Sequence, residues 1–235
     1  MIPASFEYHR PQSLHEAIGL LAQHGDDARV VAGGHSLIPM MKLRLAKPGQ
    51  LVDLQDLSEL RGIHNEAGML VIGAMTTQHE LIGSEQLAGS CPIIRETALV
   101  IADPQVRYCG TLGGNLANGD PGNDMPAVML ALGAIYRVQG PHGQRDIPAR
   151  DFYRGVYSTA LLDGEILTAI HIPVPAGGHG WAYEKQKTQG RGLRHGRGGG
   201  DPDDGGRGLH DGCDRANQPR RHPLVCSACQ RSAGR

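Results

Sequence analysis

The stretch Ala32-Gly33-Gly34-His35-Ser36 and its counterpart Thr111-Leu112-Gly113-Gly114-Asn115 decide how this sequence is interpreted. Each places a Gly-Gly pair after an apolar segment and follows the pair with small polar residues. Glycine lets backbone N–H groups approach a bulky anion closely, and consecutive N–H groups in such turns form an anion-binding concavity. One pair is typical of an ordinary turn. Two pairs 80 residues apart predict a dinucleotide site in which backbone amides hold the diphosphate.

The spacing of the glycines disfavours a Rossmann fold, because neither stretch has the pattern G-x-G-x-x-G. The second stretch continues into Asn118-Gly119-Asp120-Pro121-Gly122-Asn123-Asp124. Asp120 and Asp124 could form a metal pair, but Gly-Asp-Pro-Gly is also typical of a plain turn. His35 is either a phosphate contact or the residue where a helix starts, and its side-chain role stays open.

The hydrophobic pattern predicts a mixed α+β fold without a fixed repeat. Ser13-Leu14-His15-Glu16 has the form of a capping box, and apolar residues follow at helical spacing until Gly25. Further helices are predicted at 77–82, 93–100 and 127–132, with a helix or irregular turn at 36–46. Strands are predicted at 28–32, 51–54, 69–74, 134–139, 144–147 and 165–172. A Gly-Pro-His-Gly turn is predicted to join the strands at 134–139 and 144–147.

Composition divides the 235 residues into a body and a tail. Residues 1–186 carry a formal charge of −6, whereas residues 187–235 carry +5 and contain no Ile, Phe, Met, Tyr or Trp. A segment this poor in apolar residues cannot offset its ordering entropy by burial, so it should not form a core. The sequence therefore does not predict one uniform globule.

Several classes of protein are disfavoured. The longest apolar run, about 127–136, is too short to span a bilayer, and Gly133 interrupts it. The first ten residues have charged side chains and no apolar signal region. The five cysteines do not form a secreted disulfide framework, so a cytoplasmic location is expected; they are Cys91, Cys109, Cys213, Cys226 and Cys229.

The glycine motifs resemble those of a known family. Ala32-Gly33-Gly34-His35-Ser36-Leu37-Ile38-Pro39 and Thr111-Leu112-Gly113-Gly114-Asn115 closely resemble the two FAD-binding loops of flavoprotein subunits in the xanthine oxidase superfamily of molybdenum hydroxylases. The run Asn118-Gly119-Asp120-Pro121-Gly122-Asn123-Asp124-Met125-Pro126 looks most like the medium subunits of the aerobic carbon monoxide dehydrogenase branch. The resemblance covers about residues 1–185, including Ile101-Ala102-Asp103-Pro104-Gln105.

The resemblance implies an α+β fold, a vanillyl-alcohol-oxidase (PCMH)-type FAD-binding domain over residues 1–176. Its two subdomains would span about 1–56 and 57–176, and FAD would lie extended between them. Residues 177–235 would begin a smaller C-terminal α/β domain whose remainder is missing or garbled.

The resemblance also implies the residues that contact FAD. Residues 32–36 and 111–115 would wrap the diphosphate. Asp124 would accept hydrogen bonds from the ribityl hydroxyls, and Lys185 would lie near the pyrimidine edge of the flavin. No catalytic residue and no metal ligand is expected, because the flavin supplies the redox chemistry. The expected cofactor-binding residues are Ala32, Gly33, Gly34, His35, Ser36, Leu37, Ile101, Ala102, Thr111, Gly113, Gly114, Asn115, Asp124 and Lys185.

The implied function is electron transfer within a larger complex. The chain would take electrons from the [2Fe–2S] clusters of an iron–sulfur small subunit, which a molybdenum large subunit feeds, and pass them to an external acceptor. A dimer of heterotrimers is expected, with no nucleic acid and no transmembrane segment. The chain has no cysteine pattern for a cluster of its own.

The tail predicts a shift of reading frame near codons 185 to 187. Moved by one nucleotide, the degenerate codons of 191–195 permit Gly-Asp-Tyr-Ala-Thr, and those of 200–204 permit Val-Ile-Leu-Thr-Met. Those of 214–218 permit Ile-Gly-Leu-Thr-Asn, and the family pattern calls for all three blocks in this order. The tyrosine that the family places over the flavin maps to Leu193, so weak FAD retention and poor assembly are expected.

Three alternatives concern the tail. Its Arg and Gly residues could bind nucleic acid, but aromatic stacking residues are absent. Cys226 and Cys229, with Cys213 and His222, could hold zinc, although one CxxC is a weak signal. The chain could also be an inert product of the frameshift.

Overall fold

The computed structural model describes residues 2–175 and 180–185. Residues 2–183 of this set belong to one compact unit, and Glu184 and Lys185 belong to a second unit. All of the elements below lie in the first unit. The tail predictions for 187–235, with Leu193 and the possible zinc ligands, lie outside the described residues.

A small parallel sheet forms the N-terminal part of the unit. It consists of β1 (Glu7–His9), β2 (Ala28–Val31) and β3 (Gln50–Asp53), in the order β1-β3-β2. Helix α1 (Leu14–His24) covers it with Leu14, Ala17, Ile18 and Leu21, and α2 (Leu37–Lys42) follows β2. Short 3₁₀ turns lie at η1 (Gly25–Asp27) and η2 (Ser58–Leu60).

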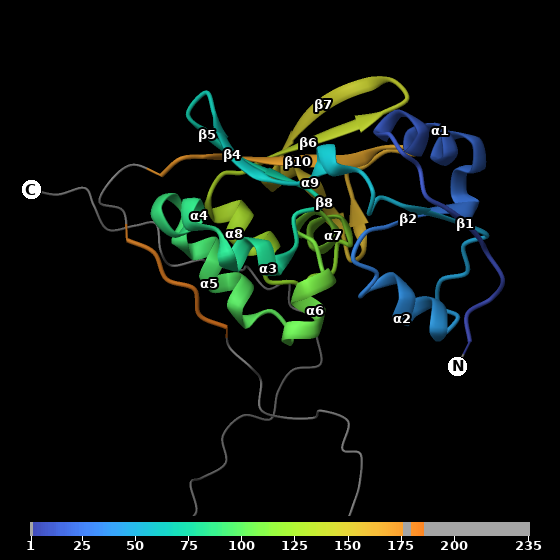
Figure 1. The fold of residues 1–235 in the computed structure, drawn as a ribbon, viewed down its shortest axis with the longest axis horizontal. Coiled ribbons are helices and arrows are strands. Elements are labelled where there is room, and N and C mark those ends of the chain that lie inside the picture. The colour runs from blue at the N-terminus through green and yellow to red at the C-terminus, as the bar shows by residue number, and fades with distance from the viewer. Residues whose placement is uncertain (1, 176–179, 186–235) are drawn as a thin grey trace, which may run out of the picture. The chain divides into compact units, whose positions relative to one another are not determined.

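An antiparallel sheet of five strands forms the rest of the frame, in the order β4-β5-β10-β6-β7. Figure 1 shows the helices of the middle of the chain beneath one face of this sheet. The strands are β4 (Ile63–Glu66), β5 (Met69–Gly73), β6 (Ile135–Gly140), β7 (Gly143–Pro148) and β10 (Ile166–Pro173).

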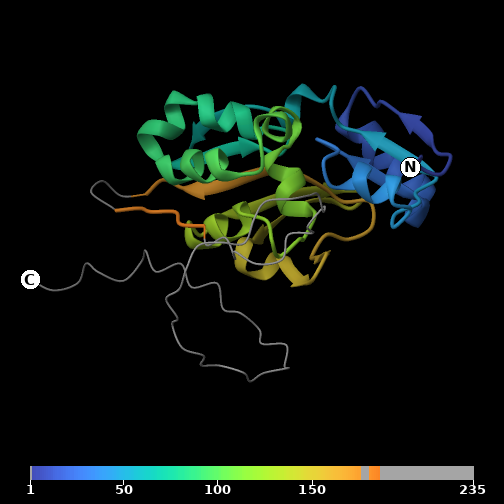
Figure 2. The ribbon, with the colours of Figure 1, turned by 90° about the horizontal axis from the view of Figure 1, so that it is seen from below.

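Short helices connect β5 to β6 and bury the larger core with the sheet. Leu81, Ile94, Leu112 and Met125 are fully buried members of this core, one from each of four helices. The view of Figure 2 shows α3 to α6 lying together along the sheet. These helices are α3 (Gln78–Gly83), α4 (Glu85–Ser90), α5 (Pro92–Val100), α6 (Pro104–Cys109), α7 (Leu112–Ala117) and α8 (Met125–Ala131). Helix α9 (Ala149–Phe152) and the hairpin β8 (Tyr153–Gly155) and β9 (Ser158–Thr159) precede β10.

The α+β prediction is confirmed, and so are most of the predicted elements. Ser13 caps α1 through the Glu16 N–H, and Gly25 ends the helix with φ +52°. The Gly140-Pro141-His142-Gly143 turn joins β6 to β7 as expected, with Gly140 paired to Gly143. The sequence analysis did not predict β1, β4, α4, α6, α7, α9, β8 or β9. Within the residues that the structure describes, no helix is long and apolar enough to cross a membrane.

Candidate cofactor-binding site

The two glycine stretches lie against each other. A Cβ atom on Gly33 would come within 2.7 Å of the Gly110 Cα atom, and still closer to the carbonyl oxygen of Cys109. Along the same contact, a Cβ on Gly114 would lie 3.5 Å from the Cβ of Ala32. The fold therefore brings together two stretches that are 80 residues apart in sequence, and at Gly33 the spacing leaves no room for a side chain.

The first stretch offers free backbone donors. It leaves the carboxyl end of β2, where Val31 pairs with Asp53 of β3, and it ends where α2 begins. Gly34 has φ +72°, a value that glycine adopts without strain. The N–H groups of residues 33–36 donate to no group among the residues that the structure describes. Four consecutive free N–H groups next to a positive-φ glycine suit an anion such as a diphosphate.

The His35 side chain turns back on its own loop. Its Nδ1 atom lies 2.7 Å from the carbonyl oxygen of Gly33, and the ring is exposed. This contact shapes the loop, and a role for His35 in binding phosphate stays a prediction. Ser36 and Leu37 lie beside it at the start of α2, where Ser36 makes no side-chain capping bond.

The second stretch differs from the expected loop of free amides, because it is the first turn of α7. Thr111 is the N-cap, and its hydroxyl oxygen accepts a hydrogen bond from the Gly114 N–H at 3.0 Å. The N–H of Gly113 donates to the Ala74 carbonyl at 2.8 Å, and that of Asn115 to the Thr111 carbonyl. These amides are bonded within the protein, so the stretch offers side chains more than free N–H groups.

Asn115 is the clearest such side chain. Its Oδ1 atom is buried and has no hydrogen-bond partner among the described residues. Its carbonyl oxygen accepts from the Asn123 side chain at 2.7 Å, which ties the loop before α8 to α7. A buried acceptor without a donor favours a ligand with hydroxyl or amino groups at this place.

Asp124 lies next in this loop and is 8% exposed. It precedes α8, but its carboxylate makes no capping bond. Instead Oδ1 accepts a hydrogen bond from the Tyr183 hydroxyl at 2.6 Å. Burial, and then this hydrogen bond, raise the pKa of Tyr183, so the phenol stays protonated as a donor.

Ile101 and Ala102 occupy the bend between α5 and α6. Ile101 is buried in the larger core, whereas Ala102 is exposed and has φ +42°, an unusual angle for a residue with a side chain. The Arg107 guanidinium donates to both of their carbonyl oxygens, at 2.9 and 3.3 Å, and fixes the bend. Lys185 belongs to the second unit and is exposed.

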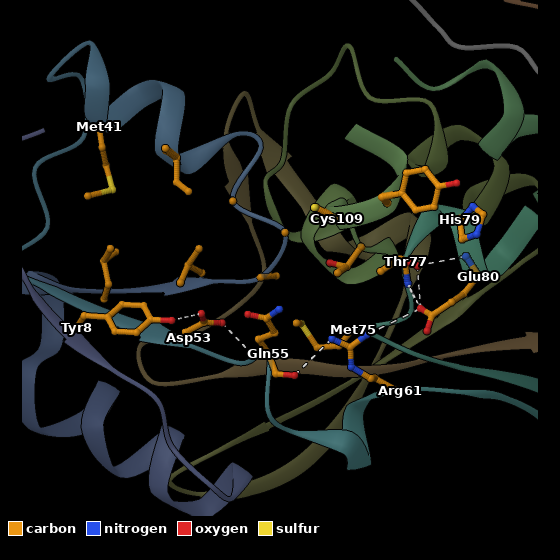
Figure 3. A pocket seen from close by; sticks show the side chains of 18 of the residues that line it. Tyr8, Met41, Asp53, Gln55, Arg61, Met75, Thr77, His79, Glu80 and Cys109 are labelled. Carbon is orange, nitrogen blue, oxygen red and sulfur yellow. Dashed lines mark hydrogen bonds and ion pairs between the residues drawn. The ribbon is translucent and has the colours of Figure 1, made fainter. Parts of the chain in front are cut away.

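A cavity of about 690 Å³ opens where the glycine stretches meet. Ala32, Gly33, Gly34, Cys109 and Thr111 are among the residues that line it. In the close view of Figure 3, Met41, Tyr8 and Asp53 lie toward one end, and His79, Thr77 and Glu80 lie toward the other. Neither Asn115 nor Asp124 is among the residues that line this cavity.

The sequence analysis did not identify several residues of this cavity. The Tyr8 hydroxyl donates to Asp53, and this hydrogen bond raises the pKa of Tyr8. The His79 ring lies 4.2 Å from that of Tyr108. No motif marks these residues, which are distant from one another in sequence.

Arg61 is the permanently cationic side chain among the residues that line the cavity, and it lies 3.9 Å from Glu80. The donors around a bound diphosphate would therefore be mostly neutral. Among the described residues, no group of three metal-ligating side chains occurs. The free N–H groups, the unpartnered Asn115 oxygen and the cavity together fit FAD.

Comparisons with known proteins agree with this geometry. Residues 4–175 match the family described as "FAD binding domain in molybdopterin dehydrogenase". The chain is 64% identical over 189 residues to the carbon monoxide dehydrogenase medium chain of Afipia carboxidovorans, covering 80% of this chain and 66% of that protein. It is 51% identical to the medium chain of Hydrogenophaga pseudoflava, with the same two shares covered.

Solved structures agree as well. A crystal structure of a Cu,Mo-CO dehydrogenase matches with a TM-score of 0.79 and 64% identity, over 80% of this chain and 65% of the other. Quinoline 2-oxidoreductase from Pseudomonas putida 86 matches with a TM-score of 0.73 and 42% identity, over 75% of this chain and 61% of the other. The chain spans just under two thirds of the two curated medium chains. By its sequence and its fold, this chain belongs to the FAD-binding domain family of molybdopterin dehydrogenases, and FAD is the cofactor of that family.

Proposed function

We propose that the chain is the FAD-carrying, electron-transferring medium subunit of a molybdenum hydroxylase, an oxidoreductase of the carbon monoxide dehydrogenase type. The observation that supports this most directly is the contact between the two glycine stretches beside four free N–H groups. The 64% identity to a carbon monoxide dehydrogenase medium chain adds support.

The residues of the chain would bind and orient the cofactor. The N–H groups of residues 33–36 would donate to the diphosphate, and Asn115 would accept a hydrogen bond from the ligand. Asp124 would receive the ribityl hydroxyls, and Lys185 would face the pyrimidine edge. Bound FAD would supply the redox chemistry, so the chain itself needs no acid, base or nucleophile. The remaining proposed contacts are Ala32, Leu37, Ile101, Ala102, Thr111, Gly113 and Gly114.

The partners are part of the proposal. An iron–sulfur small subunit would deliver electrons from its [2Fe–2S] clusters, and a molybdenum large subunit would hold the substrate, in a dimer of heterotrimers. Two relatives carry the name of a medium chain, which supports a complex of several subunits. The two cysteines in the described part of the chain, Cys91 and Cys109, are free thiols, which suits a reducing cytoplasm.

The domain boundaries are proposed as well. The subdomains would divide near residue 56, between the parallel sheet and the antiparallel sheet. The remnant of the C-terminal domain would start at about residue 177, and the frameshift would fall near codons 185 to 187. The nucleic-acid alternative rests on the tail, and the relatives named above are oxidoreductases.

The test is binding of FAD by the full 235-residue chain. Because the tail lacks the tyrosine expected over the flavin, we expect the chain to hold FAD weakly and to turn yellow only with FAD in excess. FAD should still bind more tightly than FMN or riboflavin, because these lack the diphosphate that the free N–H groups would hold. When the three are expressed together, a small share of the chain should co-purify with iron–sulfur and molybdenum subunits, since poor assembly is expected from the tail. A chain that binds no flavin, alone or with these partners, but retards DNA or RNA in a gel, would contradict the proposal.

A further inference from the structure

The hydrogen bond between Tyr183 and Asp124 joins positions 59 residues apart. At 2.6 Å it is a short bond of the kind that a phenol makes to a carboxylate. Tyr183 is partly buried against the larger core, and Asp124 is 8% exposed, so water has little access to the carboxylate. A phenol that is held in this way fixes the rotamer of the carboxylate.

The same carboxylate is connected to the glycine stretch. Asn123, its neighbour, donates to the Asn115 carbonyl at 2.7 Å, and the N–H of Asn123 donates to the Asp120 carbonyl. The loop before α8 is therefore fastened to α7 on one side and to Tyr183 on the other. A displacement of Tyr183 would therefore shift Asp124, the residue that is proposed to bind FAD. Tyr183 itself need not contact FAD.

We propose that Tyr183 is a positioning residue, whose hydroxyl holds the Asp124 carboxylate in the orientation that receives FAD. FAD binding and the anchoring of residues 180–183 then stabilise each other, since a coupling between two sites acts in both directions. This inference rests on the proposed function, because it requires that FAD contacts Asp124.

The chain contains a matched control and a natural probe. Tyr157 also donates from its hydroxyl to an aspartate of this loop, to Asp120 at 3.1 Å, but it is exposed and does not reach Asp124. Trp181 is the only tryptophan of the chain, lies two residues before Tyr183 and is 38% exposed. Its emission therefore reports on the anchoring of residues 180–183.

The experiment measures the Kd for FAD and the quenching of Trp181 emission by acrylamide in the full chain. We expect Tyr183→Phe to weaken FAD binding about tenfold, as for the loss of a hydrogen bond to a charged group. It should also increase quenching, whereas Tyr157→Phe should change both by less than twofold. In Asp124→Ala the further change Tyr183→Phe should have no effect on FAD binding, because the carboxylate that it positions is gone.

The outcomes separate the two proposals. If the unchanged chain binds no FAD, the proposed function is overturned and this inference with it. If the chain binds FAD but Tyr183→Phe behaves like Tyr157→Phe, only the inference is overturned. A purely structural Tyr183 would lower the urea midpoint and weaken FAD binding equally with or without Asp124. If Tyr183→Phe does not fold, Asp124→Ala tests the same bond, and unchanged quenching of Trp181 would overturn the inference.

Discussion

Gly33 and Gly34 are neighbours that must be glycine for different physical reasons. Gly34 has a positive φ, which a side chain would strain. Gly33 does not, but a Cβ there would run into the backbone of residues 109 and 110. The first glycine thus permits a close approach of two chain segments, and the second permits a turn.

Gly33→Ala would bring a methyl group into this contact. The added methyl must displace backbone atoms, so the free energy of unfolding should fall by about 1–3 kcal/mol and FAD binding should weaken at least tenfold. Gly19→Ala is the control, because Gly19 lies within α1 and a Cβ atom there would have no other atom within 4 Å. Alanine at this position should raise the free energy of unfolding by about 1 kcal/mol. Urea unfolding and FAD titration of both variants check this, and equal stability of the two would contradict it.

The Glu165 side chain is 8% exposed, and its carboxylate accepts two hydrogen bonds from the Arg145 guanidinium, at 2.7 Å each. Hydrogen bonding to Arg145 holds the pKa of Glu165 below its usual value. The stabilisation is therefore complete above the unfolded pKa, near 4.5, and is lost as pH falls through the lower folded pKa.

Glu165→Gln should accordingly reduce the free energy of unfolding at pH 7 and flatten its decline below about pH 4.5. The exposed ion pair of Arg150 and Asp151 supplies the control, since Asp151→Asn should change little at either pH. Urea unfolding between pH 3 and 7 measures both. A Glu165→Gln curve parallel to that of the unchanged chain would rule out this linkage.

Among the elements, α7 is intrinsically weak. It has six residues, two of them the glycines 113 and 114, which disfavour helix. Its start depends on the Thr111 hydroxyl, which caps the Gly114 N–H. The helix that shapes the cofactor site is thus stabilised mainly by its cap and by the burial of Leu112 and Leu116.

Removal of that cap should weaken both α7 and the cofactor site. Thr111→Ala should lower the free energy of unfolding by about 1 kcal/mol and weaken FAD binding, whereas Thr111→Ser keeps the hydroxyl and should retain most of both. Thermal unfolding with and without FAD separates the effects. If alanine and serine variants bind FAD equally well, the hydroxyl has no part in the site.

Elements with strong local signals could be predicted from the sequence. The capping-box pattern at Ser13 and the apolar spacing after it place α1 correctly, although the Glu16 carboxylate accepts from the Gln12 N–H and not from that of Ser13. The Gly-Pro-His-Gly turn places the β6–β7 hairpin. The two glycine stretches also predict correctly where these two chain segments come into contact. Glycine is the residue that permits so close an approach of one backbone to another.

Elements that depend on distant partners could not be predicted. The three residues of β1 form a strand only through pairing with β3, some 43 positions later, and have no pattern of their own. The second stretch was expected as a loop because its glycines disfavour helix, but Thr111 and the bonds to residues 74 and 76 override this preference. The hydrogen bond between Tyr8 and Asp53 joins residues 45 positions apart, so no local sequence pattern predicts it.

For the whole molecule, the opposite charges of body and tail support the reading-frame hypothesis. A gene whose frame is moved by one nucleotide after codon 185 should encode the three blocks that the family pattern requires. The restored protein should retain more FAD per chain than the present one and should assemble with its partners. DNA sequencing, followed by flavin absorbance per protein, checks this. A neighbouring frame that cannot encode the blocks would end the hypothesis.

The contact between Gly33 and residue 109 has an asymmetric consequence for mutational tolerance. Position 109 contributes its carbonyl group there, while its thiol is exposed. A saturation library should therefore accept many amino acids at 109 but almost none except glycine at 33. The number of amino acids tolerated would therefore differ sharply between positions 33 and 109, although both positions belong to the same contact.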